Sequence, residues 1–158
     1  MKKLRLYLDT SVISHLDAPD VPEKEADTKR LWERIKAEEF EVVISDLTIV
    51  EIEAAPEHKR SFMQSMIADI SSIYVERNNE AKRMSDLYVA VGGLPPKSKD
   101  DALHIAIATI SNRDVILSWN FKHIVNMRAM VAVDASNTRE GYKSIRILAP
   151  NMILSEEE

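Results

Sequence analysis

The chain contains no cysteine, and this absence removes several classes of site at once. Without thiols there is no disulfide framework, no thiolate zinc site, no iron–sulfur centre and no cysteine nucleophile. Any bound metal must therefore be held by oxygen or imidazole ligands. The sequence also lacks a run of about 18 apolar residues, the length that spans a membrane, and its charged start, Met1-Lys2-Lys3-Leu4-Arg5, is unlike a signal peptide. We expect a cytoplasmic protein with no membrane partner.

Glycine and proline are scarce, with three and six residues in a chain of 158, and no low-complexity tract is visible. Nothing in the sequence therefore has the composition of an interdomain linker. Hydrophobic residues make up 45% of the chain, which is enough for one buried core. We expect a single domain over residues 1–150 and a short C-terminal segment, 151–158, with the acidic end Glu156-Glu157-Glu158.

Acidic residues outnumber basic ones, with 26 Asp and Glu against 21 Lys and Arg, so the formal net charge is −5. This balance disfavours nucleic acid as a partner, because phosphate contacts from Lys and Arg dominate that affinity. Part of the acidity lies in the tail, and a metal shared by clustered acids would neutralise more. Two groups of basic residues could either guide RNA or be ordinary solvated surface. The first is Lys29, Arg30, Arg34 and Lys36, and the second is Lys97, Lys99, Lys122 and Arg128. The second group carries more weight because it flanks the acids described below.

Short runs rich in β-branched residues alternate with segments of helical spacing along the chain. The runs lie at residues 4–8, 41–45, 73–75, 115–118 and 145–148, and they have the composition of buried parallel strands. The apolar stripes with helical spacing are Leu31-Trp32-Ile35, Phe62 to Ile70, and Ala81 to Val91. In the second stripe, Met63 and Met66 belong to the core or to a homodimer face. The third helix ends at Gly92-Gly93. A further helix, buried from Ala102 to Ile110, has Ser98 as its expected N-cap. This alternation predicts a three-layer α/β/α domain with a mainly parallel sheet of four to five strands.

Acidic and amide side chains follow three of the expected strands. Asp9 ends the first strand, Glu51 follows the second, and Asn120 follows a later one, while Asp101 begins the buried helix. Functional groups of open α/β sheets gather beyond the C-terminal ends of the strands, so these side chains are expected to converge. The three-residue spacing of Ser45, Thr48 and Glu51 lets Glu51 point back toward the strand ends. Clustered carboxylates require protonation or a cation, and oxygen ligands suit Mg²⁺ or Mn²⁺.

Four ordered segments carry a resemblance to a known family: Leu6-Tyr7-Leu8-Asp9-Thr10-Ser11, Ser45-Asp46-Leu47-Thr48-Ile49-Val50-Glu51, Asp101-Ala102-Leu103-His104-Ile105-Ala106-Ile107-Ala108, and Leu117-Ser118-Trp119-Asn120-Phe121-Lys122-His123-Ile124. Together they resemble the PIN-domain family, which includes the VapC-like toxin ribonucleases of toxin–antitoxin systems. The final run Ile145 to Pro150 looks like the family's last strand. The resemblance implies a PIN-like fold and a Mg²⁺- or Mn²⁺-dependent endoribonuclease. It also implies an RNA substrate and an antitoxin protein as partner.

The resemblance also assigns roles to individual residues. Asp9, Glu51 and Asp101 match the three acids that hold the metal for phosphodiester cleavage. Thr10 or Ser11 matches the hydroxyl that accompanies the first acid. The fourth acidic position of many members falls at Asn120, an amide, as in a subgroup with a Thr-Trp-Asn-like motif. The number of bound metals stays open for this reason, and Asp100 is the acid placed to compensate.

Each of these residues also has an ordinary structural interpretation. Asp9, Asp101 and Asp100 are plausible turn or helix-start residues, Glu51 a solvated helix acid, and Asn120 a cap amide. His104 in an apolar helix is more often a packing residue, and for His123 the sequence does not choose between phosphate and backbone. The main rival function is a non-catalytic PIN-like protein that acts by binding RNA or a protein partner. A haloacid dehalogenase-type phosphatase is disfavoured because Ser11 stands where its second Asp is needed.

Overall fold

The chain folds around a five-stranded sheet in which every strand pair is parallel. The computed structural model describes residues 2–155. Its strands are β1 (Leu4–Leu8), β2 (Phe40–Ser45), β3 (Ile73–Val75), β4 (Val115–Leu117) and β5 (Arg146–Leu148), in the order β3-β2-β1-β4-β5. This arrangement confirms the predicted α/β fold. Because β1 is central, the residue that follows it is flanked by the C-terminal ends of β2 and β4.

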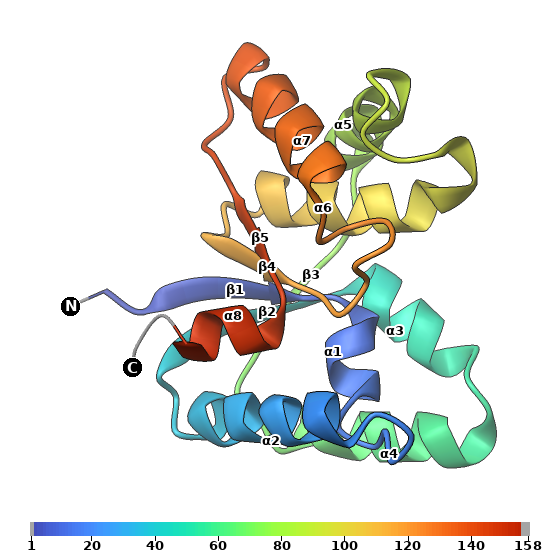
Figure 1. Ribbon diagram of the computed structural model, residues 1–158, viewed down its shortest axis with the longest axis vertical. Helices are drawn as coiled ribbons and strands as arrows, with labels where there is room; N and C mark the ends of the chain where they lie inside the picture. Colours follow the sequence, from blue (N-terminus) through green and yellow to red (C-terminus); the bar gives the residue numbers. More distant parts are fainter. Residues whose placement is uncertain (1, 156–158) are drawn as a thin grey trace.

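Helices cover both faces of the sheet (Figure 1). On one face lie α1 (Thr10–Ser14), α2 (Pro22–Lys36), α4 (Glu57–Ala68) and α8 (Pro150–Ser155), and on the other lie α5 (Asn79–Ala90), α6 (Lys99–Ile110) and α7 (Met127–Arg139). A short 3₁₀ turn, Pro96–Ser98, leads into α6, and α3 (Asp46–Glu53) begins directly where β2 ends. The three layers agree with the sequence prediction.

Alternation along the strands divides the core between the two faces. Leu6 and Leu8 of β1 pack with the helices of the α2 face, whereas Tyr7 between them packs with the α6 face. The expectation that all five strands are buried is wrong for β3, where Ile73 is 47% exposed and Tyr74 is 57% exposed. The reason is positional, since β3 lies at the sheet edge and pairs only with β2.

Helix α7 is absent from the sequence prediction, and its composition explains why. Its buried residues are Ala129, Val133, Ser136 and Asn137, a face too small and too polar to stand out as an apolar stripe. Asn137 accepts a hydrogen bond from the Tyr88 hydroxyl at 2.5 Å and donates one to Thr109 at 3.2 Å, which joins α7 to α5 and α6. At Gly93 a Cβ atom would lie 2.6 Å from the Cβ of Ala132, so glycine is needed where α7 crosses the end of α5.

The described part of the expected C-terminal segment, residues 151–155, belongs to helix α8. Helix α8 lies against α2, and its Ile153 and Leu154 are buried. These side chains help to close the core on the α2 face. The acidic end of the predicted C-terminal segment, Glu156 to Glu158, lies outside the described residues. Within residues 2–155, no helix has both the length and the apolar character needed to cross a bilayer.

The N-terminal edge of the sheet is joined by a charged cluster around Asp114. Its carboxylate accepts hydrogen bonds from the backbone N–H of Arg5 at 2.8 Å, from the Arg5 guanidinium at 3.1 Å and from Lys143 Nζ at 3.0 Å. The Asp114 N–H in turn donates to the Arg5 carbonyl oxygen at 2.8 Å. Burial alone would raise the pKa of Asp114, but the bonds from Arg5 and Lys143 outweigh it and hold that pKa well below its usual range.

We expect Asp114→Ala to lower the free energy of unfolding at pH 7 by about 1–2 kcal/mol, because it leaves the Arg5 N–H without its acceptor. The folded pKa of Asp114 lies below the unfolded value of about 3.9. Its contribution is therefore present above that value and is lost as the pH falls through the folded pKa. Urea unfolding of both proteins at pH 7 and near pH 2 measures the difference, which should shrink in acid.

Asp86→Ala provides the matched control for this prediction. Asp86 is exposed and meets Lys82 at 3.5 Å, so its removal should change the free energy of unfolding by less than about 0.5 kcal/mol. Equal losses in the two variants would contradict a special role for Asp114.

Candidate active site

The three predicted acids all lie around one end of the parallel sheet. Asp9 directly follows β1 and caps α1, Glu51 lies on α3 beyond the end of β2, and Asp101 lies in the first turn of α6. Their common neighbour is His104, which is 2% exposed and whose pKa all three acids raise through their charges. The three acids therefore lie at the same end of the sheet, and the charge of each raises the pKa of His104.

Asp9 is 4% exposed and is surrounded by hydroxyl groups. One carboxylate oxygen accepts from the Ser11 N–H at 3.0 Å and from the Ser11 hydroxyl, and the other accepts from the Ser118 hydroxyl at 2.7 Å. The Trp119 N–H donates to Ser11 Oγ at 2.9 Å, so the segments after β1 and β4 are joined at this acid. Burial raises the pKa of Asp9, and His104 and the two hydroxyls oppose that rise.

Glu51 and His104 form a partly buried pair. Glu51 Oε1 lies 2.7 Å from His104 Nε2 and accepts a hydrogen bond from the Thr10 hydroxyl. Burial alone would raise the pKa of Glu51 and lower that of His104. Their mutual attraction outweighs burial in both cases, so the pKa of Glu51 is lowered and that of His104 is raised. Both directions favour an imidazolium beside a carboxylate.

A buried chain of hydrogen bonds continues from the second nitrogen of His104. Nδ1 lies 2.6 Å from the Tyr7 hydroxyl, which lies 2.7 Å from Ser45 Oγ. In the imidazolium form of His104 both ring nitrogens donate, and in that form Tyr7 accepts from His104 and donates its own proton to Ser45. Ser45 also caps α3 by accepting from the Thr48 N–H at 3.2 Å. The orientation of His104 is thereby tied to the start of the helix that carries Glu51.

Asp101 and Asn120 lie on either side of His123. Asp101 Oδ2 is 3.1 Å from His123 Nδ1, and the His123 N–H donates to the Asn120 side-chain oxygen at 2.9 Å. Burial raises the pKa of Asp101, and His123 opposes the rise. The Asn120 oxygen caps a turn and fixes the residue that contacts Asp101. Asn120 therefore acts as the cap amide that the structural interpretation expected, and this cap also positions His123.

The remaining predicted residues divide between the site and its surroundings. Ser11 binds Asp9, whereas Thr10 binds Glu51, so both hydroxyls serve acids but different ones. Asp100 is exposed and lines a separate groove with Arg77 and Lys99 on the α5 side. The structure does not bring it into the network of the other three acids.

Sequence reasoning gave too little weight to His104 and did not identify Tyr7 or Ser118 as site residues. His104 lies three residues after Asp101 and therefore on the same face of α6. This spacing was the sequence signal that His104 lies near the acids. Tyr7 is the buried polar side chain of β1, and the strand alternation turns it toward α6. No spacing signal in the sequence distinguishes Ser118.

The carboxylates fit a hard divalent cation by their chemistry but do not form a ready three-ligand cage. Carboxylate oxygens are the ligands that Mg²⁺ and Mn²⁺ prefer. Over residues 2–155, however, no group of three or more His, Asp or Glu side chains is arranged to hold a metal ion. Each acid is bound instead by a hydroxyl or an imidazole. Binding by all three acids at once therefore requires side-chain rotation away from these partners.

The solved structures that share this fold include three that contain VapC or VapBC proteins. VapC20 of Mycobacterium tuberculosis, described as a sarcin-ricin loop cleaving toxin, is 12% identical with a TM-score of 0.57, over 89% of this chain and 98% of that one. VapBC2 of Rickettsia felis, bound to a promoter DNA fragment, is 11% identical with a TM-score of 0.59, over 92% and 98%. DNA-bound VapBC of Salmonella typhimurium is 16% identical with a TM-score of 0.52, over 93% and 98%.

At these identities the likeness shows the fold alone, and no curated protein sequence matches the chain. The sequence pattern of the PIN domain matches residues 6–120, which is more than half of the chain. That match begins in β1, runs through the segments that carry Asp9, Glu51 and Asp101, and ends at Asn120. The chain therefore belongs to the PIN-domain family.

Proposed function

We propose that this protein is a Mg²⁺- or Mn²⁺-dependent endoribonuclease that hydrolyses phosphodiester bonds of RNA. The observation that carries the proposal is the gathering of Asp9, Glu51 and Asp101, from three separate segments, around His104. PIN nucleases are generally dependent on divalent metals, which agrees with this donor set. Three acids at one end of the sheet repel one another, which destabilises the fold. A purely structural role does not account for this cost, whereas binding of a cation does.

Asp9, Glu51 and Asp101 are the residues that would hold the metal. A bound divalent ion supplies an activated water and neutralises charge on the phosphate. The chain's own residues orient these acids: Ser11 and Ser118 fix Asp9, His104 and Thr10 fix Glu51, and His123 fixes Asp101. Glu51, held ionised by His104, is placed to orient the attacking water, and Asn120 acts through His123.

We expect the purified protein to cleave RNA only when Mg²⁺ or Mn²⁺ is added. Asp9→Asn and Asp101→Asn should each lower kcat by at least about 100-fold, because each removes a charge that holds the cation. Gel analysis of a labelled RNA, with and without EDTA, measures the effect, and the melting temperature verifies folding. Asp69→Asn, which changes an exposed acid beyond the end of α4, is the matched control and should cleave as wild type. Cleavage that persists in EDTA would overturn the proposal.

The second candidate is a non-catalytic PIN-like protein that acts by binding RNA or a protein partner. The observation in its favour is Asn120, which stands at the fourth acidic position of many members and whose oxygen is already engaged by the His123 N–H. A Mn²⁺-dependent rise in melting temperature discriminates between the two functions. A protein that neither gains stability with Mn²⁺ nor cleaves RNA supports the binding function.

We further propose that the protein is the toxin of a toxin–antitoxin pair, that an antitoxin protein is its partner and that it assembles as a homodimer. The support is the likeness to VapBC proteins together with the family membership. Expression of the wild-type protein should slow bacterial growth, whereas Asp101→Asn should not. Coexpression of a reading frame adjacent to this gene should restore growth. Normal growth during wild-type expression of a folded, RNA-cleaving protein would contradict the toxin assignment.

A further inference from the structure

A basic groove lies directly beside the acid site. It has a volume of about 590 Å³ and is lined by Lys97, Lys122, His123 and Arg128 together with neutral residues that include Asn126. No acid lines it. His123 belongs to both places, since its ring is 3.1 Å from Asp101 Oδ2 while it also lines the groove. An anionic strand in the groove would therefore lead straight to the acids.

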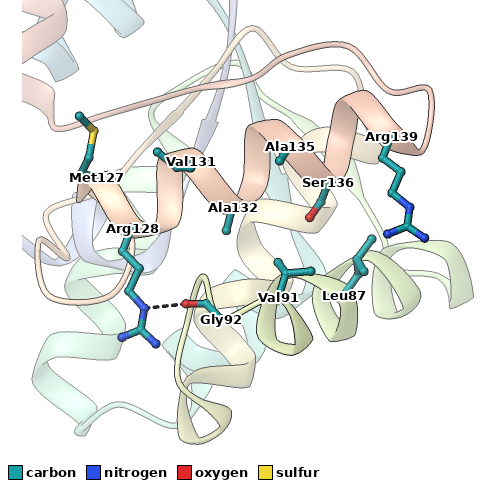
Figure 2. Close-up of a pocket in the computed structure, with 10 residues that line it drawn as sticks. All are labelled: Leu87, Val91, Gly92, Met127, Arg128, Val131, Ala132, Ala135, Ser136 and Arg139. Carbon is teal, nitrogen blue, oxygen red and sulfur yellow. Dashed lines mark hydrogen bonds between the residues drawn. The ribbon is translucent and has the colours of Figure 1, made fainter.

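The cations of this groove are not neutralised by the protein. Within residues 2–155 the ammonium groups of Lys97 and Lys122 make no hydrogen bond or ion pair, and Arg128 Nε donates to the carbonyl oxygen of Gly92 rather than to a carboxylate (Figure 2). The groove on the other side of α6 contrasts with it: there Arg77 pairs with Asp46 and Lys82 pairs with Asp86. In a chain of net charge −5, three uncompensated cations around one groove form a local positive field.

The loop that carries Lys122 and His123 is held in place by hydrogen bonds. The side-chain amide of Asn126 donates to the carbonyl oxygens of Phe121 and Lys122 at 3.1 and 3.0 Å, and its oxygen caps α7 by accepting from the Ala129 N–H at 2.8 Å. Arg128 lies in the first turn of that helix, where Figure 2 shows it reaching across to Gly92 beyond the end of α5. The backbone supports of this groove therefore exist before any ligand binds, which limits the entropy lost on binding.

We propose that this groove is a phosphate-binding subsite, in which Lys97, Lys122 and Arg128 bind consecutive backbone phosphates of the RNA strand next to the cleaved bond. The inference rests on the proposed ribonuclease function and extends it to how the strand is held. RNA is favoured over an acidic peptide because the groove runs into the acid site through His123, where a cleaved phosphodiester must lie. Backbone phosphates also repeat regularly, so one strand meets several cations in turn.

Binding of a short fluorescein-labelled RNA, measured by anisotropy in EDTA at several NaCl concentrations, tests the subsite apart from catalysis. The triple variant Lys97→Ala/Lys122→Ala/Arg128→Ala should bind about 10- to 100-fold more weakly than wild type. The slope of log affinity against log salt should fall by about 2, because contacts to three phosphates of a single strand each contribute about 0.7. All three side chains are exposed, and equal melting temperatures verify folding.

The control variant Lys82→Ala/Arg139→Ala/Lys143→Ala removes the same net charge at exposed cations that pair with acids elsewhere. Its affinity and salt slope should match wild type, which separates a local subsite from the effect of net charge. Equal weakening by the two triple variants would overturn the inference. With Mn²⁺ and a longer RNA, the groove variant should raise KM while kcat at saturating RNA stays within about twofold of wild type.

The outcomes also separate the subsite from the proposed function. If wild type fails to cleave RNA but binds it through the groove, the ribonuclease proposal fails and the subsite stands. If cleavage and RNA binding are both unaffected in the groove variant, the ribonuclease stands and the subsite is wrong. A poly-glutamate peptide of equal charge tests whether RNA is the occupant. Tighter binding of this peptide than of RNA to wild type, together with loss of peptide binding in the groove variant, would overturn RNA as the occupant.

Discussion

The mutual repulsion of carboxylates at the C-terminal end of the sheet is the constraint around which the site is organised. Buried acids are tolerated when their charge is compensated or when they are protonated. The chain supplies its own compensation in His104, an imidazole whose raised pKa reflects Glu51, Asp9 and Asp101. The two ring nitrogens of His104 form hydrogen bonds to Glu51 on one side and to Tyr7 on the other. A protonated His104 gives the acids an internal counter-charge, and a bound divalent cation would add further positive charge to the site.

The order of the strands converts this local chemistry into a site. Because β1 is central, Asp9 is flanked by the segments that follow β2 and β4, and hydrogen bonds from Ser118 and the Thr10–Glu51 contact link all three. The same topology places the loop after β4 beside the start of α7, which forms the basic groove. Acids and cations are thus separated on neighbouring surfaces even though the chain as a whole is acidic. This separation answers the objection that net charge raises against a nucleic-acid partner.

Strong periodic signals predicted much of the fold and the acids, and weak signals account for what was missed. The β-branched runs identified all five strands, and β1, with Asp9 at its end, was predicted to the residue. Helix α7 was not predicted because its buried face contains Ala129, Ser136 and Asn137, which add little apolar periodicity. Pairings such as His104 with Glu51 depend on how two distant helices face each other, and spacing within either helix does not encode that. The uncompensated state of Lys122 likewise depends on which acids lie nearby in space.

The joining of Asp9 to Ser118 has a consequence for how the protein is made. Asp9 is synthesised 109 residues before its hydroxyl partner Ser118, and β5 and the core residues of α8 come later still. A nascent chain cannot assemble this end of the sheet while those segments remain inside the ribosome. The hydroxyl surroundings of Asp9 are therefore completed only after β4 and the segment that carries Ser118 have left the ribosome.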